Sequence, residues 1–335
     1  MPPSCRIAVV SDLHVAESAR AGDLQVIPTR TESGYQDEFR RFVRRHRISA
    51  DVLVPGDLTD RASPEEFQTA FGVILHLAES LSVSRERVVI VPGNHDVNWA
   101  VVRLGADYWR QQRFGPMQDQ VGALAGAVSA DGRHVCQQPY FAIWNFEEVL
   151  IVGHNSAAFD LPDRIPRRGD ANQETIEEIE EALVTYNVEP EKIKVFVTHH
   201  HAFQYSGPVT GEADFSIMMN AENLLAMLNH HSFDLFIHGH KHMPRFFIHS
   251  TDMAVPLPIL GAGSFSVLLD PRFSGYVNDQ FHLIHIEGRD RGSRHVYGKV
   301  LSWTYLTAHR WQPSHTHTHT QHSPRVSLRP LCQRG

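Results

Sequence analysis

Cysteine is scarce in this sequence of 335 residues, which holds only three, Cys5, Cys136 and Cys332. Because they are far apart and odd in number, they suggest neither a CxxC pair nor a disulfide framework. Such cysteine usage is typical of a reducing compartment, so we expect a cytoplasmic protein. The N-terminal residues lack the basic start and apolar run of a signal peptide. No stretch approaches the roughly 18 uninterrupted apolar residues that a membrane helix requires, so we expect no membrane partner.

Positive charge is also in short supply, with 31 lysine and arginine residues against 38 acidic ones and a formal net charge of −7. This balance does not favour a nucleic-acid partner, although a local basic patch stays open. With 42% hydrophobic and 21% charged residues, the composition excludes disorder, collagen and coiled coil for the whole chain. The unusually abundant residue is histidine, with 23 copies, which is typical of metal sites, acid–base chemistry or a tag-like tail.

Short β-branched runs alternate with helical patterns over the first two-thirds of the chain, which predicts an α/β fold. The runs predicted to be strands are Ile7–Val10, Val52–Val54, Val88–Val91, Ile193–Val197 and Leu235–Ile237, with a hairpin of Tyr140–Asn145 and Val149–Gly153. Apolar spacing predicts helices from Tyr35 to His46, from Phe67 to Ala78, and over Glu174–Tyr186 and Ala221–Asn229. The second of these has a clear start, because Ser63 can cap it, Pro64 suits its first turn and Glu66 completes a capping box.

From about residue 244 the pattern changes to strands without clear helices, at 246–249, 257–260, 281–287 and 296–305. We expect this block to form or complete a second sheet, so that residues 1–308 make one domain. Residues 98–135 form a long insertion with an aromatic and basic stretch, Tyr108 to Phe114, which is either a substrate-facing lid or a packed excursion. Residues 309–335 are rich in histidine and lack an apolar period, so we expect a disordered tail.

Each of the first five predicted strands ends in potential metal ligands. In open α/β sheets, ligands bind beyond the carboxyl ends of the strands, where loops converge while the sheet stays rigid. We therefore expect these side chains to meet in one cleft. The segments concerned are Ser11-Asp12-Leu13-His14, Gly56-Asp57, Gly93-Asn94-His95-Asp96, Thr198-His199-His200-His201 and His238-Gly239-His240-Lys241-His242.

Two of these strands end in matching turns, Val54-Pro55-Gly56-Asp57 and Val91-Pro92-Gly93-Asn94. Proline fixes φ at the first central position and glycine accepts the positive φ that a type II turn demands at the second. The turns therefore aim Asp57 and Asn94 outward from the sheet edge. Both glycines also let the backbone come close to a bound ion or phosphate.

The donor atoms at these strand ends are carboxylates, an amide oxygen and imidazoles, with no thiolate. This set suits Mn²⁺, Fe or Zn²⁺ in a catalytic site better than a structural zinc, which usually recruits cysteine. A central carboxylate can bridge two cations about 3.5–4 Å apart, and a bridging water is then hydroxide near neutral pH, ready for in-line attack on phosphorus. The sequence thus predicts a dinuclear centre and a metal-dependent phosphoric ester hydrolase.

The ordered set of these motifs resembles the calcineurin-like metallophosphoesterases, from residue 7 to about 250. The blocks that carry the resemblance are Asp12-x-His14, Gly56-Asp57-x-x-Asp60, Gly93-Asn94-His95-Asp96, His199 and Gly239-His240-x-His242. It implies a four-layer α/β/β/α sandwich of two mixed sheets with two divalent or trivalent metal ions. By this resemblance the first ion takes Asp12, His14, Asp57 and His242, and the second takes Asp57 as a bridge, Asn94, His199 and His240.

The resemblance also implies roles for residues beside the ligands. His95, paired with Asp96, would stabilise the transition state or protonate the leaving oxygen, and Asp60 would orient a ligand. Arg61 occupies the position where the phosphoprotein phosphatases hold phosphate with an arginine. In the run His199-His200-His201 only one residue is expected to ligate; strand position favours His199, with His200 as the alternative. His201 is either a substrate contact or a polar loop residue, and we expect His238 to be a structural histidine at the edge of the core.

The motif wording is closest to the bacterial class III cyclic-nucleotide phosphodiesterases, through GDLTDR and VPGNHD. Our leading hypothesis is therefore a phosphodiesterase acting on a small phosphoester or cyclic nucleotide. One alternative is a DNA repair exonuclease of the same superfamily, which would need a basic groove. Another is an inactive relative that serves as a binding scaffold, although such relatives typically lose ligands and none is missing in this sequence.

Overall fold

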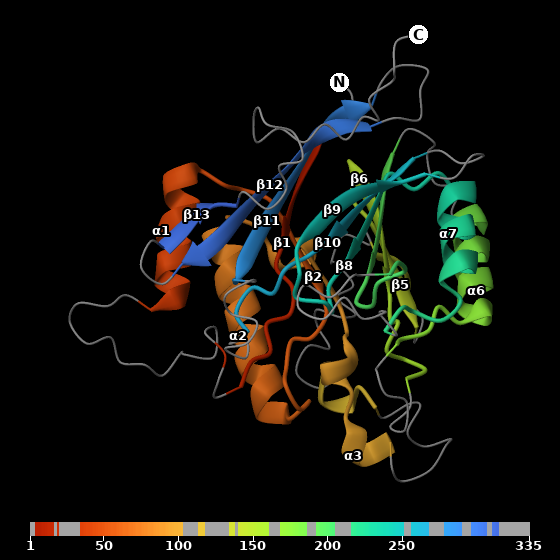
Figure 1. Cartoon of the computed structure of the whole chain (residues 1–335), viewed down its shortest axis with the longest axis horizontal. Helices are drawn as coiled ribbons and strands as arrows, with labels where there is room; N and C mark the ends of the chain where they lie inside the picture. Colours follow the sequence, from red (N-terminus) through yellow and green to blue (C-terminus); the bar gives the residue numbers. More distant parts are fainter. Residues whose placement is uncertain are drawn as a thin grey trace.

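Two β-sheets stand side by side at the centre of the molecule, and two helices cover the outer face of each (Figure 1). This confirms the predicted four-layer α/β/β/α sandwich of two mixed sheets. The computed structural model describes residues 4–16, 19, 34–102, 113–117, 134–137, 140–160, 168–185, 192–204, 216–250, 256–267, 278–289, 296–306 and 310–314. In these residues no helix is long and apolar enough to cross a membrane.

The first sheet has six strands in the order β13-β12-β11-β1-β2-β3. Its first three strands in the chain are parallel, so their carboxyl ends share one edge, while β11 to β13 extend the sheet in antiparallel fashion from β1. Its outer face is covered by α1 (Tyr35–His46) and α2 (Pro64–Ser80). The strands are β1 (Cys5–Val9), β2 (Asp51–Pro55), β3 (Val88–Val91), β11 (Gln280–Arg289), β12 (Val296–Leu306) and β13 (Arg310–Pro313).

The second sheet has seven strands in the order β4-β5-β6-β7-β8-β10-β9, and β6, β7, β8 and β10 are parallel. Its outer face is covered by α6 (Gln173–Thr185) and α7 (Ala221–His230). The strands are β4 (His134–Gln137), β5 (Phe141–Asn145), β6 (Val149–His154), β7 (Ile193–Thr198), β8 (Leu235–His238), β9 (Arg245–His249) and β10 (Leu257–Gly261).

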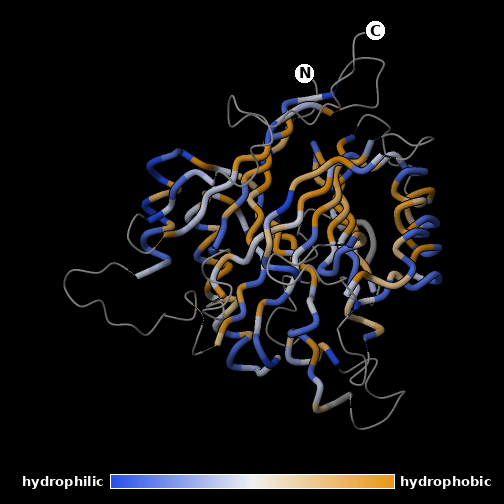
Figure 2. Tube along the Cα trace, in the orientation of Figure 1, coloured by the Kyte–Doolittle hydropathy of each residue, from blue (hydrophilic) through white to orange (hydrophobic). Residues whose placement is uncertain are grey.

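Three apolar layers hold the sandwich together, one between the sheets and one under each helix pair. Because side chains alternate along a strand, Ile7 and Val9 of β1 pack between the sheets while Ala8 packs under α1 and α2. Strands buried on both faces are continuously apolar, which is why β2 and β7 have almost unbroken apolar sequences. Figure 2 shows the hydrophobic residues along the central strands and hydrophilic ones on the outer helices.

The helices and strands predicted from local sequence patterns are confirmed. All the predicted strands and helices form with shifts of one or a few residues at their ends, and the Ser63 capping box of α2 is present. In its described part the structure adds five short elements that the sequence did not predict. They are the 3₁₀ turns η2 (Arg85–Arg87) and η3 (Asn94–Asp96), the helix α3 (Trp99–Val102) and the strands β4 and β13.

Two expectations about the C-terminal part are wrong in detail. The strands after residue 244 do not form one block, because β9 and β10 join the second sheet while β11 to β13 complete the first. Residues 310–313 are not part of a disordered tail, since β13 pairs with β12 and buries Trp311 to 6% exposure beneath α1. One large aromatic side chain on the core face stabilises this strand although its neighbours are polar. The rest of the predicted tail, 315–335, lies outside the described residues.

The insertion at 98–135 is described only in part, with 103–112 and 118–133 outside the described residues. Its basic residue Arg113 is fully buried and donates hydrogen bonds to the backbone carbonyls of Ala157, Ala158 and Asp160. The adjacent Phe114 belongs to the apolar core. Arg113 and Phe114 are therefore packed into the domain, while most of the stretch on which the lid hypothesis rests lies outside the described residues.

Candidate metal centre

The potential ligands come from both sheets and meet at one edge of the sandwich. In the first sheet the parallel strands β1, β2 and β3 end in the loops that carry Asp12, Asp57 and Asn94. In the second sheet the parallel strands β7 and β8 end in the loops that carry His199 and His240. The predicted convergence at the carboxyl ends is thus present, but it joins the edges of two sheets and does not lie along one.

One group of donor atoms surrounds the end of β1. His14 Nε2 lies 3.0 Å from His242 Nε2 and 3.5 Å from Asp57 Oδ2, and His242 Nε2 lies 3.3 Å from Asp12 Oδ1. Atoms about 2.1 Å from one ion and 90–110° apart lie about 3.0–3.4 Å from one another. Asp12, His14, Asp57 and His242 could therefore hold one cation between them.

A second group of donor atoms lies next to the first. Asn94 Oδ1 is 3.2 Å from His199 Nε2 and 3.0 Å from His240 Nδ1. His199 Nε2 is also 3.1 Å from Asp57 Oδ2, the carboxylate oxygen that belongs to the first group. Asp57 is thus placed to bridge two cations, and the arrangement is compatible with a dinuclear site.

The charge balance of the described residues fits cations at this place. Asp12 is 0% and Asp57 2% exposed, and no lysine or arginine in the described ranges forms an ion pair with either carboxylate. Two buried negative charges that face histidines but no lysine or arginine are costly unless protonated imidazoles or metal cations compensate them. The carboxylates, amide oxygen and imidazoles therefore fit two hard or borderline metal ions.

Burial and neighbouring charges shift the pKa values of three proposed ligands, Asp57, His199 and His240. Burial alone would raise the pKa of Asp57, but His199, His95 and His14 outweigh it and hold the pKa well below its usual value. Burial would lower the pKa of His199, but Asp57 and Asp12 raise it to about 9. Burial and the neighbouring imidazoles lower the pKa of His240, which keeps its ring neutral. Asp57 is therefore ionised and His240 neutral, the forms that bind metal, whereas His199 is protonated at neutral pH and must lose its proton to ligate.

The backbone of the ligand loops is unusual. Five of the eleven non-glycine residues with positive φ in the described structure are proposed ligands. Left-handed backbone costs free energy in such residues and persists where the surroundings impose it, often at functional sites. The ligands concerned are Asp12, His14, Asp57, His240 and His242, with φ of 52°, 45°, 51°, 72° and 53°.

The two turn glycines are required for different reasons. Gly56 has φ +90°, as predicted for the second central position of a type II turn. Gly93 has φ −110°, so the predicted positive φ is wrong there. A side chain at Gly93 would instead collide with the Asp57 carboxylate and its backbone nitrogen. Gly93 thus lets the β3 loop approach the bridging ligand closely.

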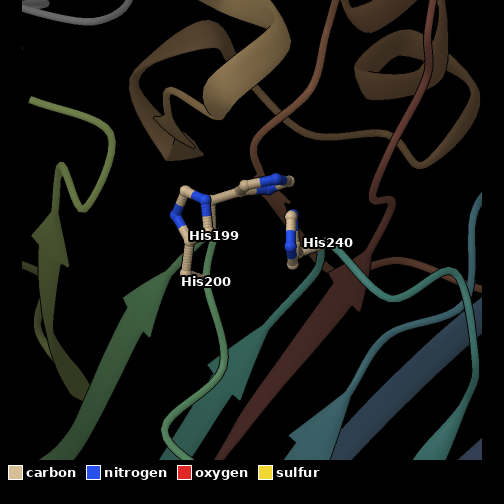
Figure 3. A group of neighbouring side chains, drawn as sticks. All are labelled: His199, His200 and His240. Carbon is tan, nitrogen blue, oxygen red and sulfur yellow. The ribbon is translucent and has the colours of Figure 1, made fainter. Parts of the chain in front are cut away.

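The geometry distinguishes His199 from His200. His199 Nδ1 donates to the Pro55 carbonyl at 2.8 Å, which directs Nε2 at Asp57 and Asn94. The His200 ring turns toward Ser156, with Nδ1 2.8 Å from Oγ, and its Nε2 has no hydrogen-bond partner among the described residues. Both rings lie beside His240 (Figure 3). His199 therefore faces more of the other proposed ligands than His200 does, although ring nitrogens of His199, His200 and His240 also lie within 4.8 Å of one another, close enough to hold an ion.

His95 and Asp96 do not pair as expected. Asp96 is fully buried, and its carboxylate accepts hydrogen bonds from the backbone amides of Leu58, Thr59 and Gly93. Asp96 thus ties the β2 loop to the β3 loop, because a carboxylate on a 3₁₀ turn can satisfy several amides at once. His95 Nδ1 instead donates to the Asp60 carbonyl at 2.9 Å, and its side chain is 40% exposed.

The remaining predicted residues lie at the rim or behind the ligands. Asp60 Oδ1 is 3.9 Å from His14 Nδ1 and 3.6 Å from His95 Nδ1, where it can orient both rings. The Arg61 side chain is 84% exposed, with Nε 3.5 Å from Asp60 Oδ2. His201 is fully buried and its ring stacks on His240 at 5.7 Å, so it packs behind the ligands. His238 is buried as expected, with Nδ1 3.0 Å from the Gly239 carbonyl.

Some residues that support the ligands escaped the sequence analysis. The Ser11 hydroxyl donates to Asp12 Oδ2, Thr59 Oγ1 donates to Asp96, and Trp99 Nε1 donates to the Asn94 carbonyl. Each lies within five residues of a motif residue in the sequence. Nearness to a motif is the one signal that could have identified them.

Comparison with known proteins agrees with the geometry. The family model described as calcineurin-like phosphoesterase matches residues 5–244, more than half of the chain. No curated protein sequence gives a significant match.

Several solved structures are similar to this chain at low sequence identity. A purple acid phosphatase from yellow lupin (Lupinus luteus) seeds matches with TM-score 0.59 and 14% identity over 94% of this chain. The chain spans 53% of the length of that phosphatase. A 5′-nucleotidase precursor from Thermus thermophilus matches with TM-score 0.45 and 10% identity, covering 89% of this chain and 54% of that one. Phosphopantetheinyl hydrolase from Mycobacterium tuberculosis matches with TM-score 0.42 and 15% identity, covering 81% of this chain and 99% of that one.

Proposed function

We propose that this chain, which belongs to the calcineurin-like phosphoesterase family, is a metal-dependent phosphoric ester hydrolase that hydrolyses a small phosphodiester at a dinuclear centre. The observation that carries the proposal is the pair of donor groups that share Asp57 Oδ2. Asp12, His14, Asp57 and His242 would hold one ion, and Asp57, Asn94, His199 and His240 the other.

The donor set supports Mn²⁺, Fe or Zn²⁺ as the resident metals, because it combines imidazole with carboxylate and amide oxygen and has no thiolate. Two cations held there would supply Lewis-acid polarisation of the phosphoryl oxygens and neutralise part of the phosphate charge. The protein's part is to fix the donors before substrate arrives, which the buried carboxylates and the His199–Pro55 hydrogen bond do.

His95 is the group that we assign to proton transfer. Its Nδ1 is engaged by the Asp60 carbonyl, so Nε2 is the atom left for substrate, and its backbone nitrogen donates to Asp57 Oδ1 at 2.9 Å. Burial would lower the pKa of His95, but Asp57 and the carbonyl and carboxylate of Asp60 raise it above the usual value. A protonated Nε2 can hydrogen-bond a phosphoryl oxygen or protonate the leaving oxygen.

The positions of the basic side chains near the site favour a singly charged diester over a doubly charged monoester as the substrate. A phosphomonoester carries close to two negative charges at neutral pH and a diester one, so monoester sites tend to recruit guanidinium groups. In the described part of the chain Arg61 is 84% exposed, and Lys241 Nζ donates to Ser216 Oγ at 3.1 Å. Neither is placed as a guanidinium clamp on a dianionic phosphate.

The test compares bis-p-nitrophenyl phosphate with p-nitrophenyl phosphate in the presence of Mn²⁺, with and without EDTA. We expect faster turnover of the diester, loss of activity in EDTA, and at least about a 100-fold loss for Asp57→Asn, since even residues that only orient ligands cost 10–100-fold. Asp37→Asn is the matched control, because Asp37 lies on α1 with its side chain 58% exposed.

The outcomes separate the parts of the proposal. Full activity in EDTA or in Asp57→Asn would refute metal-dependent hydrolysis at this site. Faster turnover of the monoester would refute the diesterase assignment alone. Salt-sensitive cleavage of DNA with no turnover of small diesters would favour the exonuclease alternative.

A further inference from the structure

The loop that carries Asp12 and His14 is held from two sides. On the side of β2, the backbone amides of Asp12, His14 and Val15 donate to the carbonyls of Gly56, Asp57 and Leu58 at 3.1, 3.0 and 2.9 Å. These bonds connect the loop to the one that carries the bridging Asp57. They are backbone bonds, which nearly any sequence could form.

On the other side, three consecutive residues after β10 bind three consecutive carbonyls of the same loop. Phe265 N donates to the Ser11 carbonyl at 2.7 Å. Ser264 Oγ donates to the Asp12 carbonyl at 2.7 Å and Ser266 Oγ to the Leu13 carbonyl at 2.6 Å. Ser264–Ser266 form what we call the serine clamp, and two of its three bonds depend on a side-chain hydroxyl.

The clamp binds a stretch of backbone whose conformation is unfavourable by itself. Asp12 and His14 both have positive φ, and the two carbonyls that the serine hydroxyls bind belong to Asp12 and to Leu13, which lies between Asp12 and His14. A peptide unit released from such a conformation relaxes toward ordinary φ and carries the flanking side chains with it. Ser264 is 1% and Ser266 0% exposed, so water cannot replace either hydroxyl without a rearrangement.

The clamp itself is rigidly anchored. Gly263 N donates to His282 Nε2 at 3.1 Å, and His282 Nδ1 lies 2.8 Å from Ser302 Oγ on β12. The Phe265 ring packs edge-on against Phe39 of α1, with ring centroids 5.2 Å apart. All of the clamp and its strand anchors lie beyond residue 244, outside the segment that the family model matches.

We propose that Ser264 and Ser266 are positioning residues for the metal ion held by Asp12, His14, Asp57 and His242. The inference rests on the proposed function, since it assumes that an ion binds there. The clamp fixes the peptide units of Asp12 and Leu13, and through them the directions of the Asp12 carboxylate and the His14 ring. In the described structure no hydrogen bond joins the clamp to Asn94, His199 or His240 of the second donor group, and His240 is linked to the clamped loop only through its backbone nitrogen, which donates to Asp12 Oδ1 at 3.1 Å.

The test is Mn²⁺ titration of the metal-free full chain by calorimetry, with Ser264→Ala and Ser266→Ala as variants. We expect about a 10-fold larger dissociation constant for one of two ions in each variant, and no change for the other ion. Ser80→Ala is the matched control, because Ser80 is also buried and its hydroxyl also donates to a backbone carbonyl, that of His76 at 2.8 Å, on α2.

Equal affinity of the serine variants and wild type overturns the proposal, and so does an equal loss at both ions, which would indicate general destabilisation. Ser264→Cys keeps the side-chain volume with a weak donor, so it tests the same bond should the alanine variant fail to fold. The readout does not require turnover. A wild type that binds two ions but hydrolyses no phosphoester would refute the proposed function and leave the clamp to be judged by affinity alone.

Discussion

The buried His154 at the end of β6 should make folding stability depend on pH. Its side chain is 1% exposed and stacks on Phe196, Nδ1 lies 3.3 Å from Thr198 Oγ1, and Nε2 has no hydrogen-bond partner among the described residues. Burial lowers the pKa of His154 to about 4, against about 6.5 in the unfolded chain. Between these values the unfolded state binds the proton and the folded state does not, so stability falls as pH falls.

The magnitude follows from the two pKa values. Each unit of pKa separation corresponds to about 1.4 kcal/mol, so the full effect is about 3 kcal/mol, of which about 2 kcal/mol is lost by pH 5 and most of the rest by pH 4. His154→Phe removes the titrating ring and keeps an aromatic side chain against Phe196. Its loss of the Thr198 hydrogen bond is the same at every pH, so it shifts the difference between the two proteins by a constant.

The assay is urea unfolding of wild type and His154→Phe at pH 7, 6, 5 and 4, with EDTA present so that metal binding does not titrate as well. Stability of the variant relative to wild type should rise by about 2 kcal/mol between pH 7 and pH 5. Other buried histidines such as His238 are present in both proteins and cancel. His230→Phe, at the partly exposed end of α7, is the control. A relative stability of His154→Phe that is independent of pH would refute the reasoning.

Four further substitutions test the packing around the site and in other parts of the fold. Gly93→Ala should displace the Asp57 carboxylate and weaken metal binding at least 10-fold in a titration. Gly72→Ala is its control, because a Cβ at this position on α2 meets nothing within 4 Å, and it should stabilise the folded protein by about 0.5–1 kcal/mol. Trp311→Ala should cost about 3–5 kcal/mol in urea unfolding, and a cost below about 1 kcal/mol would contradict the role of β13. Arg113→Met, which leaves three carbonyls without their donor, should cost at least about 3 kcal/mol, and a thermal midpoint equal to that of wild type would contradict its structural role.

Local patterns predicted the elements well because both the helices and the strands carry strong periodic signals. The capping box at Ser63 depends on residues within one turn, so sequence alone was enough to place the start of α2. The edge strand β13 carried no such pattern, because one buried residue, Trp311, anchors it among polar neighbours. Its position depends on aromatic side chains of α1 and β12 that are far away in the sequence.

Site prediction was accurate for which residues gather and less so for how they pair. The pairing of His95 with Asp96 followed from adjacency, but adjacent side chains on the 3₁₀ turn η3 point to different partners, Asp60 for His95 and backbone amides for Asp96. The sequence predicted that Gly93 is needed for a positive φ, but glycine is needed there because a side chain would collide with Asp57. Both errors arose because a motif specifies residue types without specifying which loop packs against which.

By itself the sequence determined the fold class, the ends of most elements and the set of oxygen and nitrogen donors, because strand and turn patterns are local and the ligands follow strands directly. Only the tertiary structure decided that the ligand loops come from two sheets, that Asp57 Oδ2 lies between both donor groups, and that His199 faces more of the other proposed ligands than His200 does. It also brought Ser264 and Ser266 to a loop some 250 residues earlier in the chain. Such contacts depend on how the two sheets stack, and short-range sequence patterns do not specify which distant segments come together.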